Sequence, residues 1–286
     1  MNGTKRLRPL RRIAELRASL EPARRAGSAI GLVPTMGALH EGHLALVSAS
    51  RARCAVTVAS LFVNPTQFGP GEDFTAYPRD EEADRVKLEQ AGCDVLFAPD
   101  AAEIYPRPLL TGVTVAGLSD GMEGRFRPGH FAGVATIVAK LLMIAQPSHA
   151  FFGEKDYQQL LVVRRLVEDL DIPVRIEAVP TLREPDGLAM SSRNRYLTPV
   201  ERGIAPTLYR SLSDLAAEVA DGRADCAAAA ARATERLRQA GFDSVDYIIV
   251  ADAATLAPLA RVTGPARILG AARIGRTRLI DNIAVT

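Results

Sequence analysis

Short apolar runs alternate with amphipathic helical patterns along residues 28–179. The first apolar run, residues 29–33, predicts a buried strand, and a second run at 56–63 is rich in β-branched side chains, which favour strands. Helical spacing of apolar positions follows each run, at 41–53 and at 79–91. Because strands that alternate with helices pair in parallel, the pattern predicts a Rossmann-like α/β fold with helices on both faces of the sheet.

The same alternation continues to about residue 180. Its remaining elements are strands at 94–97, 149–152 and 174–179 and helices at 133–144 and 157–169. Ahead of the first strand, Ile13, Leu16 and Leu20 recur at helical spacing. This spacing predicts a short amphipathic helix, and a basic targeting arm is the alternative.

The pattern changes after Pro180. A polar loop covers residues 183–195, and two helices follow it, the second of them rich in alanine. Three strand-like runs then close the sequence, at 245–250, 266–273 and 277–283. We therefore expect two domains, a Rossmann-like domain at residues 1–181 and a small C-terminal α+β domain at residues 182–286.

The composition narrows the class of protein. Hydrophobic residues make up 48% of the chain, which is enough for a core, and a formal net charge of +2 is too small for a broad nucleic-acid-binding surface. No apolar run approaches the length of about 18 residues that a membrane span needs. Cys54, Cys93 and Cys226 are odd in number and far apart, which suits a reducing compartment and predicts neither disulfides nor a metal site. We expect a cytoplasmic protein with buried cysteines and with no nucleic-acid or membrane partner.

The most informative segment follows the first predicted strand and reads V-P-T-M-G-A-L-H-E-G-H at residues 33–43. A strand that opens through a glycine-containing loop into a helix presents free backbone N–H groups, so we expect an anion site for phosphate here. His40 and His43 are three residues apart, which places their imidazoles side by side on a helical turn, where they could donate hydrogen bonds to a triphosphate. Two alternatives remain open: a metal-binding pair, although no third ligand is evident, and a pair of surface side chains.

Two further segments carry polar groups just after predicted strands. Pro65 ends the second strand and leaves Gln67 at its carboxyl end, the edge at which ligands bind in open α/β sheets. The alternative there is a turn held by Asn64. Lys155 follows a later strand and offers a positive charge to a nucleotide, while Asp156 occupies the place of a helix cap.

Two hydroxyls and a guanidinium stand together in the polar loop, at Ser191, Ser192 and Arg193. Such a set can clamp a phosphate on a mobile segment, and a solvated loop is the alternative. Arg127 and His130 flank a Pro-Gly turn, and the sequence assigns no role to them or to Tyr77.

These motifs occur in the order found in the pantothenate synthetase family. H-E-G-H at residues 40–43 is similar to the H-x-G-H signature of the nucleotidylyltransferase superfamily, which includes the class I aminoacyl-tRNA synthetases. The chain carries, in the order of the family, P-T-M-G-A-L-H-E-G-H (34–43), F-V-N-P-T-Q-F (62–68), R-P-G-H-F (127–131), F-G-E-K-D (152–156), M-S-S-R-N (190–194) and D-N-I (281–283). The resemblance covers residues 28–283 and departs from the family at Ser148, where an acidic residue is usual.

The resemblance implies an ATP-dependent ligase of pantothenate and coenzyme A biosynthesis. The carboxylate of pantoate would attack the α-phosphorus of ATP to give pantoyl-adenylate and pyrophosphate, and β-alanine would then attack the acyl carbon, releasing AMP and pantothenate. We expect Mg²⁺ to be held mainly by the nucleotide phosphates, because no carboxylate cluster for a protein magnesium site is evident. Asp84 could be an outer contact of the ion, but a solvated position on its charged helix is the preferred interpretation. The expected partners are pantoate, β-alanine, ATP and a second copy of the chain in a homodimer.

The resemblance also implies roles for individual residues at positions that match the family motifs. His40, His43, Lys155 and Arg193 are expected to be catalytic by stabilising the phosphates, and Gln67 and Gln159 to bind pantoate. The first domain would thus bind nucleotide and pantoate, and the second would carry a second phosphate loop. The expected ATP-binding residues are Pro34, Met36, Gly37, Ala38, Leu39, His40, Glu41, Gly42, His43, Gly153, Glu154, Lys155, Asp156, Leu182, Met190, Ser191, Ser192 and Arg193.

Three other functions fit the sequence less well than the ligase. A transferase that moves AMP or CMP to a phosphate ester would share the H-x-G-H motif but not the pair Gln67 and Gln159. A class I tRNA synthetase would need an anticodon-binding domain and a basic surface, and the sequence shows neither. A non-catalytic nucleotide-binding protein would be expected to lack some of His43, Lys155 and Arg193, all of which are present.

Overall fold

The chain divides into two compact units in the computed structural model, which describes residues 6–285. The first unit holds the described residues up to Glu154 together with Gln159–Pro180, and the second holds Lys155–Gln158 together with the described residues from Thr181 onward. By its contacts, the expected catalytic residue Lys155 therefore belongs to the second unit.

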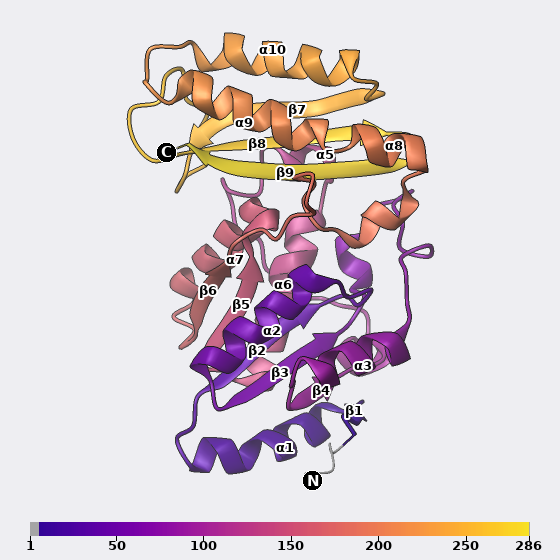
Figure 1. Cartoon of the computed structure of the whole chain (residues 1–286). Helices are drawn as coiled ribbons and strands as arrows, with labels where there is room; N and C mark the ends of the chain where they lie inside the picture. The colour runs from indigo at the N-terminus through magenta and orange to yellow at the C-terminus, as the bar shows by residue number, and fades with distance from the viewer. Residues whose placement is uncertain (1–5, 286) are drawn as a thin grey trace. The chain divides into compact units, whose positions relative to one another are not determined.

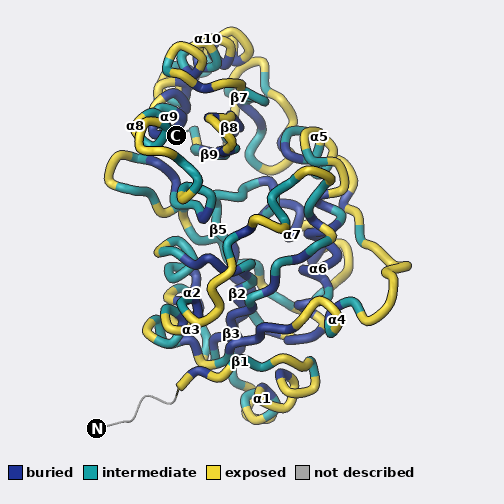
Figure 2. The backbone as a smooth tube through the Cα atoms, turned by 90° about the vertical axis from the view of Figure 1, so that its right-hand side faces the viewer, coloured by how far each residue is buried: buried dark blue, intermediate teal, exposed yellow. Residues whose placement is uncertain are grey.

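A parallel sheet forms the centre of the first unit (Figure 1). Its strands lie in the order β1-β4-β3-β2-β5-β6, with bounds β1 (Pro9–Leu10), β2 (Ile30–Thr35), β3 (Val56–Leu61), β4 (Val95–Phe97), β5 (His149–Gly153) and β6 (Arg175–Val179). β2 and β3 are buried along most of their length, as expected of strands covered by helices on both faces (Figure 2). The predicted Rossmann-like sheet is confirmed.

The helices of the first unit connect these strands. They are α1 (Ile13–Arg25), α2 (Glu41–Arg53), α3 (Glu81–Gln90), α4 (Ala101–Ile104), α5 (Glu123–Phe126), α6 (His130–Ala145) and α7 (Tyr157–Asp169), of which α7 begins in the second unit. Right-handed connections place α2 and α3 on one face of the sheet and α1, α6 and α7 on the other. On the first face, Leu46 of α2 and Leu88 of α3 share a buried cluster with Phe151 of β5.

Local sequence signals account for the ends of α3. The side chain of Asp80 accepts a hydrogen bond from the backbone N–H of Ala83 over 3.0 Å, which caps the amino end of the helix. Gly92, with a φ of +78°, follows the carboxyl end, where a left-handed residue terminates a helix at little cost.

The second unit pairs a small antiparallel sheet with helices. Its strands lie in the order β7-β8-β9, and its elements are α8 (Pro199–Ile204), α9 (Thr207–Val219), α10 (Cys226–Gln239), β7 (Ser244–Asp252), β8 (Ala266–Ile274) and β9 (Thr277–Val285). Leu208, Leu212 and Leu215 recur at helical spacing on α9 and are buried against the sheet. Gly270 of β8 makes room for them, because a Cβ there would lie 3.1 Å from Leu212 Cδ2.

Burial explains why the cysteines are plain apolar residues. Cys93 and Cys226 are buried, as expected, and Cys54 is half-buried. Burial raises the pKa of the Cys93 thiol to about 11 and also raises the pKa of Cys54 and Cys226, so all three stay protonated and weakly nucleophilic near neutral pH. Within residues 6–285, no helix is both long and apolar enough to span a bilayer.

Ser148, the departure from the family pattern, has a clear local role. Its hydroxyl accepts a hydrogen bond from the N–H of Ile30 over 3.0 Å and lies 3.1 Å from the Ile30 carbonyl oxygen. The side chain therefore satisfies the first backbone groups of β2 next to β5, which an acidic side chain could do only for the N–H.

Candidate active site

The expected site residues of the first unit gather at the carboxyl ends of its central strands. The strand order reverses between β2 and β5, which is the point at which open α/β sheets bind ligands. The loop after β2 carries residues 36–40, and the chain after β3 carries Gln67. The sheet therefore brings the expected nucleotide loop and the expected acid-binding residue to one edge of the first unit.

His40 and His43 lie side by side at the start of α2, as their spacing predicts. Their ring centroids are 4.1 Å apart. The Nδ1 atom of His40 accepts a hydrogen bond from the N–H of Gly42 over 3.2 Å, and the Nδ1 atom of His43 accepts one from the N–H of His40 over 3.3 Å. An Nδ1 atom that accepts an amide carries no proton, so each neutral ring carries its proton on Nε2. Both rings can then donate to an oxyanion without first gaining a proton.

The backbone N–H groups of this loop are used inside the protein. Those of His40 and Gly42 donate to the two imidazoles, as above, and the N–H of Gly37 donates to Thr35 Oγ1 over 3.3 Å. The N–H groups of Ala38 and Leu39 donate to a carboxylate. The sequence predicts free N–H groups here, and for these five positions that prediction is wrong, because side chains of the protein accept from them. These five amides are therefore not donors for an anion in this arrangement.

Asp84 of α3 supplies this carboxylate, and the sequence predicts a solvated side chain there. That expectation is also wrong: Asp84 is only 3% exposed, and its Oδ2 and Oδ1 atoms accept hydrogen bonds from Ala38 and Leu39 over 2.7 and 2.8 Å. A carboxylate in a charged helix looks like part of a solvated face. Leu88, one turn further along α3, indicates that Asp84 points inward, because an apolar residue at that spacing marks the inward face of the helix.

Gln67 is held at the end of the 3₁₀ helix Pro65–Gln67 and is buried. Its Oε1 atom accepts a hydrogen bond from Asn64 Nδ2 over 3.1 Å, and its Nε2 atom lies 3.2 Å from the Sδ atom of Met36. Asn64 thereby fixes the polarity of the Gln67 amide and leaves Nε2 as the donor for a ligand. The contact also places the expected acid-binding residue directly against the nucleotide loop.

Gly133 of α6 allows this arrangement. A Cβ atom at Gly133 would lie 2.3 Å from the carbonyl oxygen of Thr66, so any side chain would push the 3₁₀ helix away from α6. Asn64 Nδ2 also donates to the Gly133 carbonyl oxygen over 3.2 Å. Gln159, the other expected acid-binding residue, is half-buried near the start of α7.

A buried network holds the backbone at Gln67. Arg127 forms a bidentate ion pair with Glu72, at 2.8 and 2.7 Å, and its Nη1 atom lies 3.1 Å from His130 Nε2. His130 Nδ1 then donates to the Gln67 carbonyl oxygen over 2.9 Å. Burial lowers the pKa of His130 to about 4, helped by the charge of Arg127, so the ring is neutral and fits this chain of hydrogen bonds. The structure thus gives Arg127 and His130 a positioning role that the sequence left open.

In the second unit, β9 holds Lys155 and the start of the polar loop. The side-chain amide of Asn282 donates to the carbonyl oxygen of Lys155 over 2.9 Å. The neighbouring Asp281 accepts a bidentate pair of hydrogen bonds from Arg183, at 2.6 and 2.9 Å. Burial raises the pKa of the Asp281 carboxyl, an effect that Arg183 opposes. Lys155 itself lies 3.6 Å from Asp156 in the turn before α7.

The polar loop of the sequence is an ordered turn. The N–H of Met190 donates to the carbonyl oxygen of Leu182 over 3.0 Å, and Arg183 bridges to Ala189. Ser191 then caps the 3₁₀ helix Ser192–Tyr196 by accepting from the N–H of Arg193 over 3.3 Å. Local hydrogen bonds therefore define the backbone that carries the expected phosphate clamp.

A sequence profile of the pantoate–β-alanine ligase family matches residues 8–284. The chain belongs to this family. Full-length relatives agree with it. A pantothenate synthetase from Paramagnetospirillum magneticum is 59% identical over 276 residues, which is 96% of this chain and 97% of its own length. Another, from Rhizorhabdus wittichii, is 55% identical over 276 residues, covering 96% and 98% of the two chains.

Solved structures of the family share the fold of this chain. The pantothenate synthetase of Thermus thermophilus matches with a TM-score of 0.91 and 51% identity, over 98% of this chain and 99% of its own. The pantoate–β-alanine ligase of Francisella tularensis, solved with beta-gamma ATP and beta-alanine, matches with a TM-score of 0.82 and 35% identity, over 97% of each chain. The parallel sheet and the separate antiparallel sheet are thus features of the pantoate–β-alanine ligases.

Proposed function

We propose that this protein condenses pantoate with β-alanine to give pantothenate, AMP and pyrophosphate, through a pantoyl-adenylate. Membership of the pantoate–β-alanine ligase family supports the ligation, as do pantothenate synthetases at 59% and 55% identity. The Francisella tularensis relative, solved with beta-gamma ATP and beta-alanine, supports ATP and β-alanine as substrates.

One contact in the first unit carries most of the chemical argument. Gln67 Nε2 lies 3.2 Å from Met36 Sδ, so a group that accepts from Gln67 sits beside the loop that ends in His40. A carboxylate is such an acceptor, and adenylation requires a carboxylate next to the α-phosphate. This supports an acid-activating ligase over a transferase acting on a phosphate ester.

In the first step, the carboxylate of pantoate attacks the α-phosphorus and pyrophosphate leaves. We assign the Nε2–H groups of His40 and His43 to the phosphate oxygens, on which charge grows as the bond to pyrophosphate breaks. Lys155 and Arg193 add positive charge, and Gln67 and Gln159 hold the acid. In the second step, the amine of β-alanine attacks the acyl carbon, and AMP leaves with the bonding electrons.

We also propose that Mg²⁺ is bound mainly by the phosphates of the nucleotide. Asp84, the buried carboxylate that contacts the loop, already accepts two amide hydrogen bonds, so this donor set suits an ion held by phosphates better than one held by a protein cage. Such an ion supplies charge neutralisation on the triphosphate. The remaining ATP-binding assignments made from the sequence, among them Leu182 and Ser192, belong to the same proposal.

The proposed setting is a cytoplasmic homodimer. Three free thiols suit a reducing compartment. Leu110 and Met143 in the first unit are 97% and 57% exposed, and we propose that contact with the second subunit covers such apolar side chains. Light scattering during size-exclusion chromatography measures the oligomeric state, and a monomer at micromolar concentration would contradict the dimer.

A direct assay tests the reaction. With ATP and pantoate alone, the protein should release pyrophosphate, and addition of β-alanine should give AMP and pantothenate in equal amounts. Pantoate labelled with heavy oxygen in its carboxylate should pass one labelled oxygen to AMP, because that oxygen forms the bond to the α-phosphorus. ADP and phosphate as products, or unlabelled AMP, would contradict the adenylate mechanism.

A further inference from the structure

The loop between β2 and α2 contains a turn of the kind that binds anions, and a side chain of the protein already occupies it. Ala38 has a positive φ angle of +52°, whereas Leu39 after it does not, and such a change of hand between successive residues turns neighbouring N–H groups toward one point. That point is occupied by the carboxylate of Asp84, whose Oδ2 and Oδ1 atoms lie 2.7 and 2.8 Å from the nitrogen atoms of Ala38 and Leu39. The turn therefore binds a carboxylate of the protein itself.

We propose that Asp84 is a positioning residue for the adenylation step, acting as the resident anion of this turn. Asp84 holds the loop in the shape that presents the Nε2–H groups of His40 and His43, and it keeps the Ala38 and Leu39 amides from the triphosphate. The inference rests on the proposed function, because it assigns Asp84 to that same site.

Backbone geometry shows why the loop needs such a partner. Alanine disfavours the left-handed region, so Ala38 keeps its φ of +52° only while something compensates. The two hydrogen bonds to Asp84 supply that compensation. The next N–H along the chain, that of His40, donates to His43 Nδ1 and so sets which nitrogen of His43 carries the proton. A loop released from Asp84 would therefore disturb the second histidine as well as the first.

A second contact from α3 brings a positive charge to the same loop. Lys87, three residues further along the helix, donates from Nζ to the carbonyl oxygen of Leu39 over 2.6 Å. From the same face of α3, Asp84 thus accepts from amide groups of the loop, and Lys87 donates to one of its carbonyl groups. Without a nearby cation, a buried carboxylate would repel the phosphates that the histidines are proposed to bind.

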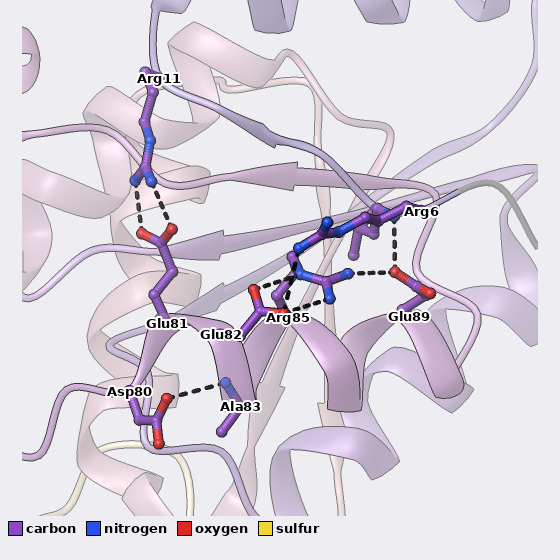
Figure 3. A network of polar contacts seen from close by, with 9 residues as sticks. Arg6, Arg11, Asp80, Glu81, Glu82, Ala83, Arg85 and Glu89 are labelled. Carbon is purple, nitrogen blue, oxygen red and sulfur yellow. Dashed lines mark hydrogen bonds and ion pairs between the residues drawn. The ribbon is translucent and has the colours of Figure 1, made fainter.

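Other residues of α3 form ion pairs that hold the helix in place (Figure 3). Arg11 forms a bidentate pair with Glu81, at 2.6 and 2.5 Å. Arg85 lies between Glu82 and Glu89, at 2.7 and 2.5 Å. These pairs tie α3 to the segment before α1 and to itself, while Asp84 and Lys87 remain available to the loop.

Asp84→Asn is the sharpest test, because it keeps the shape and one acceptor but turns a donor toward the second amide. We expect single-turnover pyrophosphate release from ATP and pantoate to fall by about 10- to 100-fold, with the pantoate KM changed by less than about twofold. Asp80→Ala is the matched control. It removes the cap of the same helix but no contact to the loop (Figure 3), so it should lower Tm while pyrophosphate release stays within about twofold of wild type.

A measurement without substrates separates this inference from the proposed function. Amide hydrogen exchange at Ala38 and Leu39 should be about tenfold faster or more in Asp84→Asn, and unchanged relative to global stability in Asp80→Ala. If the wild-type protein releases no pyrophosphate, the proposed function falls while the exchange result still tests the loop. Unchanged exchange in Asp84→Asn, or equal losses of pyrophosphate release in the two variants, would overturn the positioning role of Asp84.

Discussion

The side-chain amide of Asn282 donates a hydrogen bond to the main-chain carbonyl oxygen of Lys155 over 2.9 Å. Asn282 lies in the last strand of the chain, and its Oδ1 atom accepts from Arg267 Nε over 2.7 Å, which fixes the orientation of the amide. The D-N-I motif near the end of the sequence therefore has a physical role. It holds the backbone of an expected catalytic lysine from within the second unit.

Asn282→Ala should slow adenylation and also destabilise the second unit. The change leaves the Lys155 carbonyl oxygen without its donor, a loss of about 1 to 3 kcal/mol when the group stays buried, and frees the backbone that carries the ammonium group. We expect single-turnover pyrophosphate release to fall by about tenfold with a small change in pantoate KM. Asp246→Asn, which weakens the Asp246–Arg278 pair in the same sheet, is the control and should leave this rate unchanged. Equal rates of pyrophosphate release in the two variants would show that Asn282 does not position Lys155 for adenylation.

Gln67→Glu should weaken pantoate binding by about tenfold or more. Asn64 holds one oxygen of the side chain, so the substitution replaces the Nε2 donor by an oxygen that repels a carboxylate. The prediction is a raised KM for pantoate with the KM for ATP little changed, measured by steady-state kinetics. Gln239→Glu, on an exposed helix of the second unit, controls for the added charge. If ATP binding alone suffered, the assignment of Gln67 to the acid would be wrong.

Acid should weaken the fold through His130. Its pKa in the folded protein is about 4, against a reference value of 6.5, so the unfolded chain takes up this proton more readily. Stability from this group is complete above about pH 6.5 and falls as the pH drops toward 4, by up to about 3 kcal/mol in the free energy of unfolding. Urea denaturation at a series of pH values measures it. In His130→Asn the pH dependence should be shallower over this range, and parallel curves for the two proteins would contradict the lowered pKa.

Arg193→Ala should lower the rate of adenylate formation far more than it weakens pantoate binding. If Arg193 contacts the phosphates, Arg193→Lys should recover only part of the rate, because a lysine keeps the charge but loses the planar fork. Single-turnover pyrophosphate release measures both. Arg195→Ala, at an exposed position of the same 3₁₀ helix, is the matched control and should behave as wild type. A wild-type rate in Arg193→Ala would show that the clamp lies outside the catalytic site.

Periodic segments of the sequence predicted most of the fold. The helix expected at 41–53 is α2 and that expected at 157–169 is α7, because each has a long apolar stripe and a distinct start. Pairing partners far away in the chain decide the shorter elements. β1 is only two residues long and exists because it pairs with β4, and no local pattern of Pro9 and Leu10 reveals that partner.

The same distinction separates what could and could not be predicted in the site. The residue types and the loops of the site could be predicted from the sequence, because phosphate chemistry calls for imidazole and cationic side chains after strands. The partners that orient these side chains could not be predicted. Asp84 reaches a loop more than forty residues earlier in the chain, and His130 reaches the carbonyl of Gln67 over a similar span, so both contacts depend on packing that local sequence does not encode. Burial makes Asp84 a fixed hydrogen-bond acceptor instead of a solvated charge. It makes His130 a neutral hydrogen-bond donor instead of a plain turn residue.

The filled turn at Gly37 and Ala38 has a consequence for inhibitor design. A ligand cannot gain affinity by aiming an added anionic group at the Ala38 and Leu39 amides, because that group would have to displace a covalently tethered carboxylate at high effective concentration. Acceptors placed to meet the Nε2–H groups of His40 and His43 do not have to displace Asp84. Two adenylate analogues that differ only in an anion directed at this turn should therefore bind with equal affinity by calorimetry, and they should diverge once Asp84 is replaced by alanine.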